Sequence, residues 1–181
     1  MFAYAACEGI QLRLDGTKTQ VRRPRANRAG RRAFVSGKRK HNTSKTTIVS
    51  DGQGRTLWAG AVRPGRMHDQ TAVKTEGIGD LLRQHPTVNA TVDAGCQGLA
   101  KAFGGQVHAP PPKPQKDAPA EEVAAWQQAR KQQSSRRICV EHAGAEHRQW
   151  RALQRYTGRR DYYAQTHLAI AGLVSDRAAC R

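Results

Sequence analysis

Acidic residues are scarce in this sequence: 14 Asp and Glu stand against 31 Lys and Arg among 181 residues. The resulting net charge of +17 says little about the fold, but it indicates an anionic partner such as nucleic acid or a membrane surface. Long apolar runs are also lacking, since no stretch approaches the ~20 residues that span a bilayer. The opening "MFAYAACEGIQ" has neither the basic segment nor the long apolar segment of a signal peptide. Nucleic acid is therefore the favoured partner, and no membrane association is expected.

Cysteine pairs and aromatic side chains are few as well. The four cysteines form no CxxC pair and no cysteine–histidine pair with zinc-finger spacing, so we interpret them as reduced thiols of a cytoplasmic protein. Aromatic residues make up only 6% of the chain and show no stacking-platform motif, which disfavours a basic RNA-binding protein without an active site. A basic RNA-binding protein without an active site is therefore the third alternative, after an enzyme that acts on DNA and a DNA-binding protein without activity.

Two segments alternate between apolar and polar side chains, and we predict that each is a strand ending at an aspartate. The first is "IQLRLD", which ends at Asp15, and the second runs from Val88 to Asp93. A β-hairpin is predicted for residues 43–62, because β-branched and apolar segments flank the turn "DGQG". A further short strand is expected in "QVHAP".

The segments after the hairpin predict helices. Asp69 is a good N-cap for a helix running to about Arg83, and "QGLAKAF" predicts a short helix. The Pro-rich segment 109–119 is interpreted as a loop inside one catalytic domain that comprises residues 1–181.

The C-terminal part of the chain is predicted to be helical. Residues 121–156 have a helical composition, with an interruption expected near residues 134–135. A last helix is predicted for residues 162–177, and its inward-packing residues are expected to be Leu168, Ala171 and Val174. This order of elements predicts an α/β protein with a mixed central sheet flanked by helices.

A continuous basic segment runs from Lys18 to Lys45, with eleven basic residues and no acidic one. Its middle, "RRPRANRAGRR", has no periodicity and contains Pro and Gly. It is either a solvated loop or a loop ordered in part by an anionic partner. The sequence alone does not separate these two interpretations.

The two strand-terminal aspartates indicate a site at one edge of the sheet. Ligand sites in open α/β sheets form beyond the carboxyl ends of parallel strands. Two adjacent carboxylates repel each other unless a cation compensates them, and hard oxygen ligands suit Mg²⁺ or Mn²⁺. Taken singly, each aspartate has a simpler interpretation as a turn residue, in "DG" and in "DAG". It is their combination in a chain with few acids that favours a metal site.

A third carboxylate would complete such a site, and the segment "RRICVEHAGAEHRQW" offers Glu141 and Glu146. Because they are five residues apart on a helix, they point in different directions. Glu141 lies on the face of Ala145 and Ala152, small residues that would let the helix approach a sheet closely. This favours Glu141, but on helix geometry alone both glutamates remain candidates.

These residues lie within a wider pattern that resembles the DDE transposases of bacterial insertion sequences, in the insertion-sequence 5 and Harbinger group. Four segments carry the resemblance in the family's order and cover most of the chain: "LRLDGTKTQVRRP", "SGKRKHNTSKTTIVSDGQGRTLWAGAVRPGRMHDQTAV", "VDAGCQGL" and "RRICVEHAGAEHRQWRALQRYTGRRDYYAQTHLAIAGLVSDR". The blocks "GKRKHNT", "GRMHD" and "RICVEH" lie in register with both aspartates, which makes the resemblance specific.

The resemblance implies an RNase H-like fold and a metal-dependent transposase or endonuclease that nicks transposon ends and joins the 3′-hydroxyl to target DNA. The implied catalytic and metal-binding residues are Asp15, Asp93 and Glu141, the last from the match at "CVEH". They would hold two ions, Mg²⁺ or Mn²⁺, for an in-line phosphoryl transfer. DNA is the implied partner, both as transposon ends and as target, and the expected assembly is a homodimer in a DNA-bound complex.

The chain departs from the family in two places. Cys96 stands where the family commonly has an aromatic residue, and only fourteen residues precede Asp15, where relatives carry a helix-turn-helix region. We therefore expect a catalytic-domain fragment: a truncated copy, a second reading frame or an excised domain. In the second case a separate frame would supply the N-terminal DNA-binding fragment. The alternative function is that of a truncated, catalytically incompetent remnant that acts only as a basic DNA-binding protein.

Overall fold

The computed structural model describes residues 1–23, 30–37 and 40–180, except for the side chains of residues 136–141. Its strands are β1 (Leu12–Val21), β2 (Thr43–Ser50), β3 (Thr56–Ala59), β4 (Arg63–Pro64), β5 (Ala90–Thr91), β6 (Val107–His108) and β7 (Arg155–Tyr156). They form one seven-stranded sheet in the order β3-β2-β1-β5-β6, with β4 paired to β2 and β7 paired to β1. Strands β1, β2 and β3 are antiparallel, whereas β5 and β6 are parallel to β1, so the predicted mixed sheet is confirmed.

Strand β1 is the centre of the sheet and is longer than predicted. It continues past Asp15 to Val21, because β2 pairs with it antiparallel from Arg13 opposite Ser50 to Gln20 opposite Thr43. The prediction that this strand ends at Asp15 is therefore wrong. Asp-Gly is a turn signal, but β2 offers hydrogen-bond partners along the whole segment, and these keep the backbone extended.

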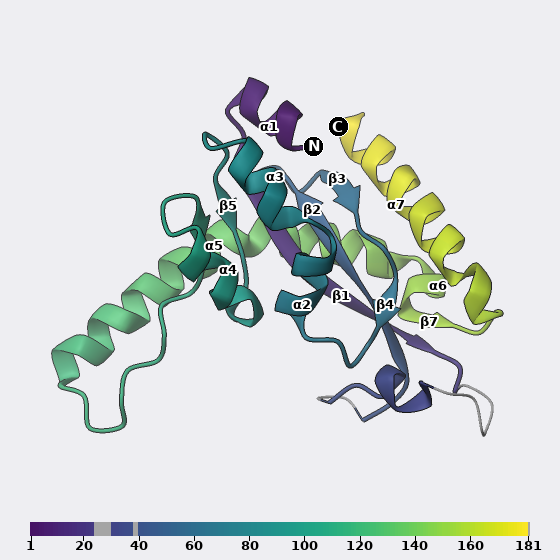
Figure 1. Cartoon of the computed structure of the whole chain (residues 1–181), viewed down its shortest axis with the longest axis horizontal. Helices are drawn as coiled ribbons and strands as arrows, with labels where there is room; N and C mark the ends of the chain where they lie inside the picture. The colour runs from purple at the N-terminus through teal and green to yellow at the C-terminus, as the bar shows by residue number, and fades with distance from the viewer. Residues whose placement is uncertain (24–29, 38–39, 181) are drawn as a thin grey trace.

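One face of the sheet is covered by four short helices, which lie in front of it in Figure 1. They are α1 (Phe2–Glu8), α2 (Asp69–Thr75), α3 (Ile78–Gln84) and α4 (Gln97–Ala102). The single helix predicted from Asp69 to about Arg83 is wrong, because Gly77 between α2 and α3 has a φ of 68°, which a right-handed helix does not accommodate. The short helix in "QGLAKAF", the strand in "QVHAP" and the hairpin of β2 and β3 are confirmed.

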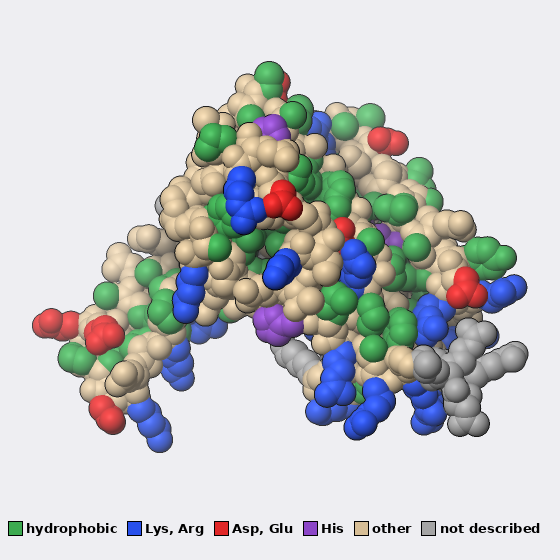
Figure 2. All heavy atoms as spheres, in the orientation of Figure 1, with side chains coloured by type: hydrophobic (Ala, Val, Ile, Leu, Met, Phe, Trp, Pro, Cys, Tyr) green, Lys and Arg blue, Asp and Glu red, His purple; other side chains and the backbone are tan. Residues whose placement is uncertain are grey.

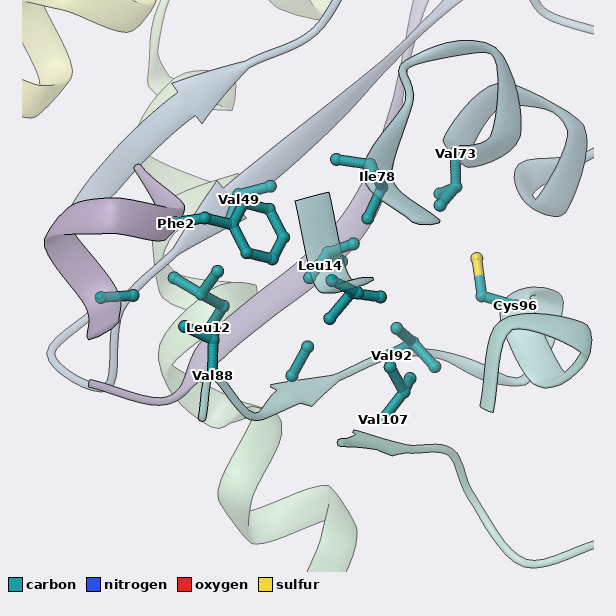
Figure 3. Packing of buried hydrophobic residues seen from close by; sticks show 13 residues of the cluster. Phe2, Leu12, Leu14, Val49, Val73, Ile78, Val88, Val92, Cys96 and Val107 are labelled. Atoms are coloured by element: carbon teal, nitrogen blue, oxygen red, sulfur yellow. The ribbon is translucent and has the colours of Figure 1, made fainter. Parts of the chain in front are cut away.

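The main hydrophobic core lies between these helices and the sheet (Figure 3). Leu12, Leu14 and Val49 from the two central strands pack there against Val73 and Ile78 from α2 and α3. The alternation predicted around β5 is confirmed by the burial of Val88, Ala90 and Val92 in the same cluster. The opposite side chains of β1 and β5, which include both aspartates, consequently face away from this core.

The other face is covered by α5 (Ala120–Gln149), α6 (Arg151–Gln154) and α7 (Tyr163–Ala179). Helix α5 passes behind the sheet in Figure 1, and its first half projects beyond it. The helix is continuous, so the interruption predicted near residues 134–135 is wrong. No helix in the described part of the chain is long and apolar enough to cross a membrane.

Helix α7 confirms the last predicted helix but not all of its inward face. Ala171 and Val174 are buried as predicted, whereas Leu168 is 54% exposed. The buried stripe includes Tyr163 and His167 instead, which a search for apolar residues alone does not select. Tyr163 packs with Leu153 of α6 in a second, smaller core cluster.

The basic segment from Lys18 to Lys45 is only partly within the described residues. Residues 18–21 belong to β1, and Arg31–Phe34 form a short 3₁₀ helix, η1. An isolated bridge joins Val35 to Asn42 just before β2. Residues 24–29 and 38–39 lie outside the described residues, so both interpretations of this loop stay open.

Two histidines are buried between α5 and α7. His147 and His167 are 1% and 0% exposed, and their ring centroids are 6.1 Å apart. Burial, and then the charge of His147, lowers the pKa of His167 to about 4. Burial also lowers the pKa of His147, against weaker opposing effects of the Ala143 carbonyl and Glu146. At pH 7 both imidazoles are therefore neutral in the folded chain.

We expect acid to destabilise the fold through this pair. The unfolded chain protonates these histidines near pH 6.5 and the folded chain does not, so the free energy of unfolding should fall as the pH drops from about 6.5 towards 4. The loss should be up to about 3 kcal/mol for His167. The variant His167→Leu should lose much of this pH dependence, whereas His142→Gln, on the exposed side of α5, should keep it. Urea unfolding between about pH 7 and pH 5 measures the effect, and an unaltered dependence in His167→Leu would contradict it.

Candidate active site

Asp15 and Asp93 lie level with each other at neighbouring strands. Strands β1 and β5 are parallel, with Leu12 opposite Ala90 and Arg13 opposite Thr91. Asp15 and Asp93 each lie two residues beyond the last of these pairs, and β5 itself ends at Thr91. Asp15 alternates with the core residues Leu12 and Leu14, so its carboxylate points away from the main core, toward the face that α5 covers. Asp93 follows β5 and lines a pocket together with residues of α5.

Both aspartates are half-buried and are held by nearby backbone amides. Asp15 Oδ1 accepts a hydrogen bond from the N–H of Gly16 at 2.9 Å, and Asp93 Oδ1 accepts one from the N–H of Gly95 at 3.0 Å. Asp93 thereby caps η2, a short 3₁₀ helix (Ala94–Cys96) that leads into α4. These bonds fix the orientation of the two carboxylates relative to their own backbone.

A third aspartate, Asp69, lies beside the same two glycines and was not predicted to belong to the site. It is the first residue of α2, and the preceding His68 caps that helix, with Nδ1 accepting from the N–H of Gln70 at 3.3 Å. The expected role of Asp69 as N-cap is therefore wrong. A methyl group added at Gly16 would lie 2.6 Å from Asp69 Oδ1, and one added at Gly95 would lie 3.0 Å from Asp69 Oδ2. The Asp69 carboxylate thus occupies the space beside both glycines.

A buried lysine holds Asp69 in this place. Lys45 Nζ lies 2.7 Å from Asp69 Oδ1, and the same ammonium donates to the carbonyl of Met67. The Lys45 side chain is only 2% exposed, against 27% for Asp69. A buried ammonium is costly unless it is paired and hydrogen-bonded. A lysine in the β-branched strand "TSKTTIVS" was the signal in the sequence that an acidic partner had to be near.

The pKa of the Cys96 thiol is affected by all three aspartates. Burial, and then the negative charges of Asp93, Asp69 and Asp15, raises the pKa of Cys96 to about 12, and its hydrogen bond to Asp93 acts in the same direction. Cys96 is 5% exposed and belongs to the main core. The three carboxylates therefore gather in one region, where β1, η2 and α2 meet.

Glu141 lies in α5, but its side chain is outside the described residues. The packing argument that favoured it over Glu146 is supported at Ala152, which packs against the second core cluster, but not at Ala145. The buried part of this turn contains Ala143 and His147, each 1% exposed, whereas Ala145 is exposed. The choice of Glu141 therefore depends on the resemblance at "CVEH". Glu146 is half-buried beside His147, and its charge acts on that imidazole.

Among the described side chains, no group of three histidine, cysteine, aspartate or glutamate residues is arranged to hold a metal ion. Asp15 and Asp93 provide two carboxylates next to the paired ends of β1 and β5, whereas Asp69 is neutralised by Lys45. A third ligand would have to come from elsewhere, and α5, which contacts β1, contains Glu141. A set of carboxylate oxygens fits a hard divalent cation such as Mg²⁺ or Mn²⁺.

A pocket opens beside Asp93, between the 109–119 segment and the first half of α5. Its volume of about 580 Å³ is in the range of ligand sites. Lys113, Trp126 and Arg130 line it, and the Arg130 guanidinium lies over the Trp126 ring at 5.2 Å from the centroid. The Trp126 indole N–H donates to the Pro111 carbonyl at 3.1 Å, which ties α5 to the Pro-rich segment. The pocket therefore joins an acidic wall to a basic and aromatic wall.

Level carboxylates on a mixed sheet, within a chain of high positive charge, are features of an enzyme that acts on nucleic acid. Comparison with protein families agrees, because the family model described as DDE superfamily endonuclease matches residues 14–175. The match covers most of the chain and includes Asp15, Asp93 and Glu141. This chain belongs to the DDE superfamily endonucleases, a family of nuclease and transposase domains. No curated protein and no solved structure matches it.

We expect Cys96 to resist thiol reagents in the folded chain. Its thiol is buried and its pKa is about 12, because forming a thiolate beside three carboxylates is unfavourable, whereas Cys7 and Cys180 are exposed. Iodoacetamide labelling at about pH 8, followed by peptide mass spectrometry, should modify Cys7 and Cys180 readily and Cys96 only after denaturation. Labelling of Cys96 at the rate of Cys7 would contradict the arrangement described above.

Proposed function

We propose that this chain is the catalytic domain of a DNA transposase of the insertion-sequence 5 and Harbinger-like group, built on an RNase H-like fold. Its reaction would nick transposon ends and join the freed 3′-hydroxyl to target DNA. The observation that carries the proposal is the level placement of Asp15 and Asp93 at β1 and β5, in a chain that belongs to the DDE family. The mixed sheet, with helices on both faces, is compatible with that fold.

The metal-binding role is assigned to Asp15, Asp93 and Glu141, with two ions, Mg²⁺ or Mn²⁺, as the cofactor. The fit rests on the two carboxylates that share one face of the sheet and on the passage of α5 over that face. When bound, such ions supply Lewis-acid stabilisation of the attacking and leaving oxygens in a phosphoryl transfer. Without them, the two level carboxylates would repel each other.

The chain's own groups orient the reacting carboxylates. The amides of Gly16 and Gly95 hold Asp15 and Asp93, and the Cys96 thiol, which stays protonated, bonds to Asp93 on its buried side. In the first step a water oxygen bonds to phosphorus as the phosphodiester P–O bond breaks. In the second step a DNA 3′-hydroxyl replaces water, so one phosphodiester is exchanged for another. Neither step consumes a nucleotide cofactor.

DNA binding is assigned first to an edge of the molecule that is rich in Lys and Arg. Figure 2 shows these side chains gathered along the lower edge of the view, where η1 lies in Figure 1. Segments far apart in the sequence meet there, since the N–H of Arg66 donates to the Ala33 carbonyl and the Arg160 guanidinium lies over the Phe34 ring. Such a surface binds phosphates without reading the base sequence.

The pocket beside Asp93 is the second assigned DNA contact. Lys113 and Arg130 would bind phosphates of the strand next to the cleaved bond, and Trp126 offers an aromatic surface to a base. A homodimer on DNA is the assembly we propose for full transposition.

The rival function is DNA binding without catalysis, as in a degenerate remnant, and an RNA-binding role is the third. A nuclease assay on supercoiled plasmid with Mg²⁺ or Mn²⁺ separates the first two. Competition between duplex DNA and RNA for binding to the chain tests the third function, RNA binding.

Each of Asp15→Asn, Asp93→Asn and Glu141→Gln should lower Mn²⁺-dependent plasmid nicking, because each removes one negative oxygen ligand while nearly keeping its shape. The expected loss is more than the tenfold to hundredfold that loss of a supporting group costs at metal sites. The same three variants should also lose the rise in melting temperature that Mn²⁺ gives the parent chain. Glu146→Gln is the matched control and should retain both properties. Equal nicking by Asp93→Asn and the parent would remove Asp93 from the active site.

Lys113→Gln and Arg130→Gln should each weaken binding to duplex DNA about equally for all sequences. Each should also make the slope of log affinity against log salt shallower by about 0.9, the value expected for one phosphate contact. Arg177→Gln, at the exposed end of α7, should leave the slope as it is. Fluorescence anisotropy over a salt series measures this, and equal slopes in all four proteins would exclude the pocket from the DNA contact.

A further inference from the structure

The two candidate catalytic aspartates are each followed closely by a glycine whose presence the backbone does not explain. Gly16 lies inside strand β1, not in a turn. The described glycines with a positive φ, where glycine is favoured for its backbone, are Gly9, Gly30, Gly54 and Gly77. Gly16 and Gly95 are not among them, so what they provide is space for a neighbour.

Asp69 is a neighbour of both glycines. At Gly16 an added methyl group would lie 2.6 Å from Asp69 Oδ1, and at Gly95 it would lie 3.0 Å from Asp69 Oδ2. The contact at Gly16 is too short for a Cβ atom unless the carboxylate moves, whereas at Gly95, where Asp93 Oδ1 would also lie 3.1 Å away, a shift of a few tenths of an ångström would be needed. The two oxygens of one carboxylate therefore rest against two separate segments, β1 and the turn after β5. Those are the segments that present Asp15 and Asp93.

The Asp69 carboxylate is also held by Lys45 of the neighbouring strand β2. Lys45 lies on β2, the other neighbour of β1, and its ammonium reaches Asp69 Oδ1 at 2.7 Å. The same ammonium donates to the carbonyl of Met67, two residues before Asp69, so it holds the start of α2 as well as the side chain. Since Lys45 is 2% exposed, little water competes for these bonds. The carboxylate is thus fixed relative to β2.

We propose that Asp69 is a positioning residue of the active site: its carboxylate, anchored by Lys45, acts as a spacer between Gly16 and Gly95 and so sets the separation of Asp15 and Asp93. This rests on the proposed function, because the role is defined relative to those two aspartates as ligands of a divalent cation. Asp69 is not itself a ligand in this scheme, since Oδ1 is bonded to Lys45 on the opposite face of the sheet from Asp15. The size of the Asp69 side chain and its hydrogen bond to Lys45 set the separation of Asp15 and Asp93, whereas its negative charge does not contribute to cation binding.

The experiment compares Asp69→Asn with Asp69→Ala in the full chain, with Mn²⁺ alone as the probe. Asn keeps the size and can still accept from Lys45, whereas Ala removes the spacer. We expect Asp69→Ala to raise the dissociation constant for Mn²⁺, followed by the electron paramagnetic resonance of free ion without DNA, by about tenfold or more. Asp69→Asn should stay within about threefold of the parent. If Asp69 were a ligand, Asn would lose as much as Ala, and this result would overturn the proposal.

Further variants make every outcome decisive. Asp69→Ala leaves Lys45 buried and unpaired, so it is also made together with Lys45→Met, which removes the unpaired ammonium; this double variant still lacks the spacer and should bind Mn²⁺ about tenfold or more weakly than the parent. Gly16→Ala should weaken Mn²⁺ binding in the parent but have little further effect with Asp69→Ala, because the added methyl then has room. Asp80→Asn, an exposed aspartate on α3, is the control without effect.

The same measurements separate this inference from the proposed function. If the parent chain and Asp93→Asn bind Mn²⁺ equally, the proposed site is wrong and the spacer has nothing to position. If Asp93→Asn loses the ion while Asp69→Ala binds it as the parent does, the site stands and the positioning role of Asp69 is overturned.

Discussion

The site of this protein depends on the pairing of strand β1 along both of its edges. On one side β2 pairs antiparallel with it and keeps it extended past Asp15, although Asp-Gly favours a turn. On the other side β5 pairs parallel with it, with Arg13 opposite Thr91, so that Asp15 and Asp93 both follow two residues later. A slip of one residue in either strand would send one carboxylate to the opposite face of the sheet. The pairing of one strand therefore decides whether the two acids can work together.

A chain with few acids concentrates three of them in one place, and the surrounding groups balance the charge. Lys45 neutralises Asp69 from within the sheet, and backbone amides bind Asp15 and Asp93. The Cys96 thiol stays protonated and completes the buried side of Asp93. Basic residues stay at the outer edge and at the pocket, where a DNA backbone would approach.

The predictions that held were those in which side-chain alternation and local turn chemistry agree. The hairpin of β2 and β3, the alternation around β5 and the helix in "QGLAKAF" are of this kind. The errors arose where a local signal competed with a distant partner. The turn signal at Asp15 was overridden by β2, and Leu168 was left exposed because α7 packs through Tyr163 and His167. Asp69 was assigned to capping because its bond to Lys45 spans two separate elements.

The sequence by itself determined the class of protein, the mixed α/β composition and the candidate residues Asp15 and Asp93, because charge, periodicity and motifs are local properties. The tertiary structure decided that these two residues are level, that Gly16 and Gly95 leave room for Asp69, and that Lys45 is the buried partner of Asp69. Each of these facts is a distance between segments far apart in the chain. Such distances depend on strand register and helix packing. Both are selected by the free energy of the whole fold and not by that of any one segment.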